Sequence, residues 1–85
     1  MSINTAWKCI GTVLERQEFF IDGINIWEYL WKETEDRVYV QHPVYNQTHL
    51  FDIYEISRNG LSIKFAAGEF SNGVWGFYQQ IGTEG

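Results

Sequence analysis

The residues that could bind a metal ion are few and far apart in this sequence. His42 and His49 are the only two histidines, and Pro43 interrupts the segment between them. A loop that folded back could bring both imidazoles to one ion, with Cys9 or Glu69 as a further ligand. The paired ligand spacing of zinc-binding sequences is absent, however. We therefore expect neither a metal ion nor another cofactor.

Residues for covalent catalysis are equally scarce. A nucleophilic serine, threonine or cysteine needs a nearby base that a third group orients. Ser57 and Ser71 both adjoin expected tight turns, and neither lies in a strand-to-helix motif that presents a catalytic serine. Cys9 is surrounded by apolar residues in an expected strand, where a thiol packs as a small hydrophobe. We expect no catalytic residue, and a binding protein rather than an enzyme.

Glu69 is the acidic residue with the least obvious role. It stands between Gly68 and Phe70 in an otherwise apolar passage, where burial would raise the pKa of its carboxyl group. We favour an exposed loop carboxylate, because the flanking glycine indicates a turn and turns usually lie at the surface. Glu69 and Phe70 are candidate contact residues, as is Tyr45 in the loop that follows Pro43.

A run of aromatic residues is the strongest indication of binding. The segment 24–32 fits both helical spacing and strand alternation. We favour a strand, because it directly follows a hairpin turn and is rich in β-branched and aromatic residues. As a strand it presents Trp27, Tyr29 and Trp31 on one face. Either the N-terminal strand or the 42–48 loop covers this face, or a partner or ligand does.

The elements that must position these residues are hairpins. Asx-Gly pairs at Asp22-Gly23, Asn59-Gly60 and Asn72-Gly73 each favour a type I′ turn between two strands. The acidic run 33–36 is expected to form another turn. Alternation and turn residues predict strands at 7–14, 19–21, 24–32, 37–41, 49–56, 61–66 and 74–79.

These elements predict an all-β domain spanning residues 1–85. We expect a single antiparallel sheet of about seven short strands, in the form of a curled sheet, a small sandwich or a barrel. A helix over residues 24–33 would instead make the fold α+β. In the hairpin around Asn59-Gly60, alternation predicts that Leu61, Ile63 and Phe65 face the core while Lys64 faces solvent.

Charge and composition limit the classes of partner. Six Lys and Arg residues stand against eleven Asp and Glu, which gives a net charge of −5 and argues against binding to nucleic acid. No apolar run is long enough to cross a bilayer, so we expect no membrane association. The N-terminus has no secretory signal pattern, which favours a cytoplasmic location.

Two functions fit these observations. The first is a small acidic cytoplasmic module for protein–protein interaction, such as an inhibitor or immunity-type protein that blocks a basic nuclease, or a homodimer. The alternative is a β module that binds a small ligand or carbohydrate by aromatic stacking.

Overall fold

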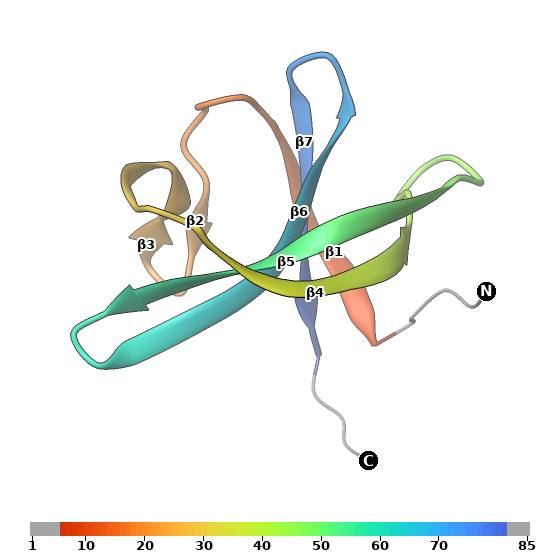
Figure 1. Ribbon diagram of the computed structural model, residues 1–85. Helices are drawn as coiled ribbons and strands as arrows, with labels where there is room; N and C mark the ends of the chain where they lie inside the picture. The colour runs from red at the N-terminus through yellow and green to blue at the C-terminus, as the bar shows by residue number, and fades with distance from the viewer. Residues whose placement is uncertain (1–5, 82–85) are drawn as a thin grey trace.

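An antiparallel sheet of five strands makes up most of the molecule (Figure 1). The computed structural model describes residues 6–81. The strand order is β1-β7-β6-β5-β4, and β2 and β3 form a separate two-stranded ribbon. The strands are β1 (Trp7–Leu14), β2 (Phe20–Ile21), β3 (Ile24–Asn25), β4 (Lys32–Gln41), β5 (Thr48–Arg58), β6 (Leu61–Ser71) and β7 (Val74–Gln80). The predicted all-β, antiparallel fold is confirmed.

The sheet is curled, as one hydrogen bond shows. Tyr78 lies on β7 and its hydroxyl donates to the carbonyl of Gln41 on β4 at 2.5 Å. Two strands, β6 and β5, separate β7 from β4 in the sheet order, so this contact requires the sheet to bend around its own concave face. Val38, Val40 and Phe51 pack with Tyr78 inside the bend.

The opposite face of the sheet is covered by residues 19–31, which we call the cover segment. Its isoleucines Ile21, Ile24 and Ile26 are buried against the sheet. The sheet contributes Ile56, Ile63, Phe65, Ala67 and Phe77 to the same cluster. Both faces of this small sheet are therefore covered from within the chain.

Two of the three predicted type I′ turns are confirmed. Both central residues have positive φ at Asp22-Gly23 (51° and 80°) and at Asn59-Gly60 (50° and 80°). At Asn72-Gly73 the prediction is wrong, because only Gly73 has a positive φ, of 79°. The register of β6 against β7 shifts between Glu69 and Ser71, so a bulge accompanies this turn.

The predicted strand over residues 24–32 is also wrong, and no long helix replaces it. After the two residues of β3, the chain forms the 3₁₀ turn η1 (Ile26–Glu28). The side chain of Asn25 accepts a hydrogen bond from the Trp27 amide at 3.3 Å and so caps this turn. The indole N–H of Trp31 donates to the carbonyl of Ile26 at 2.8 Å and stabilises the turn from its other end.

Two smaller predictions are corrected as well. The acidic run 33–36 is not a turn but part of β4, where a register shift between Glu33 and Arg37 takes up the extra residues and Glu35 has a φ of 76°. Leu61 is not in the core. It is 75% exposed, because it begins β6 at the tip of the hairpin, beyond the cover segment, whereas Ile63 and Phe65 are buried as predicted.

Candidate functional site

The predicted aromatic face is turned inward onto the sheet. The ring centroid of Trp31 lies 5.1 Å from that of Phe65 and 5.2 Å from that of Tyr54. Trp27 meets Trp75 edge-to-face at 5.8 Å. Because η1 breaks strand alternation, Trp27 and Trp31 stand four residues apart on one side of a turn rather than along a strand. The rings that pack against Trp27 and Trp31 lie on β5, β6 and β7. The cover is the central sheet.

Part of this segment nevertheless faces solvent. Leu30 is 95% exposed between the two half-buried residues Tyr29 and Trp31. Around it lies an open groove of about 410 Å³, which we call the Leu30 groove. Its lining residues are Glu15, Arg16, Trp27, Glu28, Tyr29, Leu30 and Trp31. The aromatic residues predicted as a site therefore line the floor of a groove and do not form a flat exposed face.

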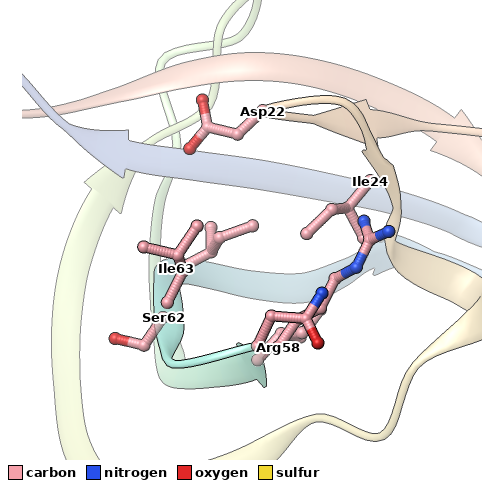
Figure 2. A pocket seen from close by; sticks show the side chains of 8 residues that line it. Asp22, Ile24, Arg58, Ser62 and Ile63 are labelled. Atoms are coloured by element: carbon pink, nitrogen blue, oxygen red, sulfur yellow. The ribbon is translucent and has the colours of Figure 1, made fainter.

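A second concave site lies between the two type I′ turns and is called the Ile63 pocket (Figure 2). Its volume is about 330 Å³. The lining residues are Asp22, Ile24, Ile56, Arg58, Asn59, Leu61, Ser62 and Ile63. The guanidinium carbon of Arg58, which lines the pocket, lies 5.8 Å from the ring centroid of Tyr29, which lines the Leu30 groove.

The other predicted contact residues lie elsewhere on the molecule. Phe70 packs with the histidines, its ring centroid 4.3 Å from His42 and 5.0 Å from His49, and Tyr45 lies 4.9 Å from His42. The carboxylate of Glu69 is exposed, as expected, but Glu69 lies in strand β6 and not in a loop, and it accepts a hydrogen bond from the Gly73 amide at 2.7 Å. Glu69 therefore stabilises the β6–β7 turn, which accounts for its place in the sequence.

The contacts of the two histidines are structural. The Nδ1 of His42 accepts hydrogen bonds from the amides of Val44 and Tyr45, at 3.0 and 3.1 Å, and so organises the β4–β5 loop. Burial lowers the pKa of His49, and the neighbouring His42 lowers it further. Among residues 6–81, no group of three or more His, Cys, Asp or Glu side chains could hold a metal ion.

Cys9 is half-buried in β1 beside Tyr78. Its thiol donates to the carbonyl of Gly11 at 3.6 Å. Burial raises the pKa of the thiol, which keeps it in the protonated form. This environment suits a packed side chain and not a nucleophile.

Comparison with known proteins finds no matching family model, no similar curated protein and no similar solved structure. In the part of the chain that the structure describes, no helix is both long and apolar enough to span a bilayer. The surface features of this chain are therefore the basis for any statement about its function.

Sequence reasoning missed Leu30, Leu61, Asp22 and Arg58 as surface residues of interest. Alternation assigned Leu61 to the core and Leu30 to the face opposite the aromatic residues. One feature could have indicated the pocket: Asp22-Gly23 and Asn59-Gly60 are the same turn type, and tight turns project from a sheet and can frame a hollow between them.

Proposed function

We propose that this chain is a protein-binding module whose contact surface is the Leu30 groove. The observation that carries the proposal is the position of Leu30, a large aliphatic side chain that is 95% exposed on a floor of aromatic residues. Exposing such a side chain has no benefit for the fold of this domain. In a complex, by contrast, Leu30 would be buried together with the exposed parts of Trp27 and Tyr29, and aromatic residues are enriched at interface hot spots.

The charge of the chain favours a basic partner. The net charge is −5, and Glu15 and Glu28 lie on the rim of the groove beside Arg16. A negative surface accelerates association with a positive one, as an inhibitor or immunity-type protein directed against a basic enzyme requires. A second copy of this chain is a less favoured partner, because two copies would bring like charges together. We place this interaction in the cytoplasm, consistent with a chain whose single cysteine is a free thiol.

Photo-crosslinking at chosen positions tests this surface. A photoreactive amino acid replaces Leu30 in one variant and Val44 in another, and both are expressed in the cells that make the protein. Val44 is the matched control, because it is a 76% exposed aliphatic residue in the β4–β5 loop, away from the cover segment (Figure 1). We expect a defined adduct at position 30 and none at position 44. Equal adducts at both positions, or none at either, would contradict the proposal.

The electrostatic part of the proposal has its own readout. If the acidic rim guides a basic partner, the association rate measured with the crosslinked and identified partner falls as salt concentration rises. An association rate that does not change with salt would contradict the proposal of a basic partner, but it would not contradict the proposed contact at Leu30.

The alternative function, a module for small ligands, finds its support at the Ile63 pocket. Trp31 packs against five aromatic rings and Trp27 against three, so both rings already stack within the chain. The pocket offers an enclosed aliphatic floor with charged groups at its rim.

A further inference from the structure

Two type I′ turns contribute residues to the Ile63 pocket. Asp22-Gly23 joins β2 to β3, and Asn59-Gly60 joins β5 to β6. All four residues have the positive φ angles of type I′ turns. The fold of the chain itself forms the walls of the pocket, and a preformed site loses less free energy on binding.

The floor of the pocket consists of branched aliphatic side chains. Ile24 and Ile63 are each 8% exposed and Ile56 is buried, so the hollow ends on the hydrophobic core. Leu61 stands at the rim. A volume of about 330 Å³ is near the lower end of the range for ligand pockets. These features select a small ligand with aliphatic groups.

Two charges of opposite sign line the same pocket. Asp22 and Arg58 both line it, and in the view of Figure 2 the Asp22 carboxylate and the Arg58 guanidinium stand apart, with the guanidinium toward Ile24. The one ion pair among residues 6–81 joins Arg37 to Asp52, so neither Asp22 nor Arg58 has an opposite charge as partner there. Tyr29 lies beside the Arg58 guanidinium and limits the positions that it can adopt.

The arrangement of these charges defines the ligand. A guanidinium presents a fork of N–H donors that fits a carboxylate, and a carboxylate at the opposite rim suits an ammonium group. The two charges and the isoleucine floor line one pocket. A dipeptide carries an ammonium group at one end and a carboxylate at the other, one for each of the two charges that line the pocket, whereas a free amino acid carries both on one carbon atom.

We propose that the Ile63 pocket binds a zwitterionic dipeptide of aliphatic residues. The C-terminal carboxylate of the ligand pairs with Arg58, its N-terminal ammonium group pairs with Asp22, and its side chains lie on Ile24, Ile56 and Ile63. This site does not involve Leu30, so the proposal goes beyond the protein interaction proposed above. The two proposals can be tested independently of each other.

Titration of the full chain with L-leucyl-L-leucine, followed by the backbone amide resonances in NMR spectra, tests the proposal. We expect saturable shifts at Ile24, Arg58 and Ile63, with a dissociation constant on the order of 1 mM for a ligand of this size. Acetylation of the peptide's amine, or amidation of its carboxylate, should each weaken binding about two- to fivefold, as loss of a rim charge pair does.

Variants identify which protein group meets which end of the peptide. In Asp22→Asn the acetylated and free peptides should bind equally, and in Arg58→Gln the amidated and free peptides should bind equally. Asp36→Asn and Lys8→Gln remove exposed charges outside the pocket. In these variants the free peptide should still bind more tightly than the acetylated peptide and more tightly than the amidated peptide. Absence of saturable shifts, shifts confined to the Leu30 groove, or equal binding of the free and blocked peptides to the unmodified protein would each overturn the proposal.

Discussion

At the scale of single residues, glycines opposite aromatic rings determine how closely this sheet can pack. Gly68 and Gly76 are directly paired between β6 and β7, and the rings of Phe51 and Phe70 lie against them. A Cβ atom on Gly68 would come within 2.3 Å of the Phe51 ring. These glycines are therefore required for space, a different reason from the positive φ that requires glycine at the turns.

We predict that Gly68→Ala destabilises the protein by about 2 kcal/mol, because the added methyl group forces the Phe51 ring out of a packed core. Chemical denaturation measures the loss. In a Phe51→Leu background the same change should cost at least about 1 kcal/mol less, because the ring that clashes is gone. Equal costs in both backgrounds would show that the Phe51 ring is not what excludes a side chain at position 68.

At the scale of elements, the cover segment is joined to the sheet mainly through the rings of Trp31 and Trp27 and through its buried isoleucines. Two backbone hydrogen bonds, from Ile26 to the Phe19 carbonyl and from Tyr29 to the Ile26 carbonyl, shape the segment itself. It has little regular structure of its own, since β2 and β3 contribute only two residues each. Its order therefore depends on side-chain packing.

We predict that Trp31→Ala costs about 3 kcal/mol of the roughly 4 to 13 kcal/mol expected for a domain of this length. The change removes a large ring from the core and the hydrogen bond to Ile26. Hydrogen exchange should show that the amides of Ile26 and Tyr29 lose protection before that of Phe65. The adjacent Leu30→Ala should change stability by less than about 0.5 kcal/mol. Similar losses in both variants would contradict this account of the segment.

At the scale of the whole molecule, the concave face makes stability depend on pH. The pKa of His49 in the folded chain lies below its ordinary value of 6.5, because burial and the neighbouring His42 disfavour the charged form. The unfolded chain therefore binds a proton at a higher pH than the folded chain does. The contribution of uncharged His49 to the free energy of unfolding is fully present above pH 6.5, its ordinary pKa. This contribution is lost as the pH falls from that value towards the lower pKa of His49 in the folded chain.

We predict that the free energy of unfolding is lower at about pH 5.5 than at about pH 7.5, and that His49→Phe reduces this difference. Phenylalanine keeps an aromatic ring against Phe51 and Phe70 but has no group to titrate. Urea denaturation at the two pH values, with both proteins, provides the measurement. If the two proteins showed the same pH dependence, the effect would have to be assigned to other groups.

Local chemistry in the sequence determined much of this structure. Asx-Gly pairs accommodate the positive φ angles of a type I′ turn, so two hairpins could be placed from Asp22-Gly23 and Asn59-Gly60 alone. The alternation along β6 identified Ile63 and Phe65 as inward residues, and Pro43 marked the end of β4. Each of these features depends on neighbours along the chain, and so the all-β antiparallel fold could be predicted without any knowledge of long-range contacts.

The tertiary structure alone decided the rest, because the remaining features depend on residues far apart in the sequence. Whether Trp27 and Trp31 face solvent or the core depends on a sheet that β5, β6 and β7 complete only later in the chain. The same contacts favour a 3₁₀ turn over the strand that local propensity predicted. The Ile63 pocket exists only because two turns nearly forty residues apart, at Asp22-Gly23 and Asn59-Gly60, lie on either side of it. Pairings of that kind are absent from any local pattern.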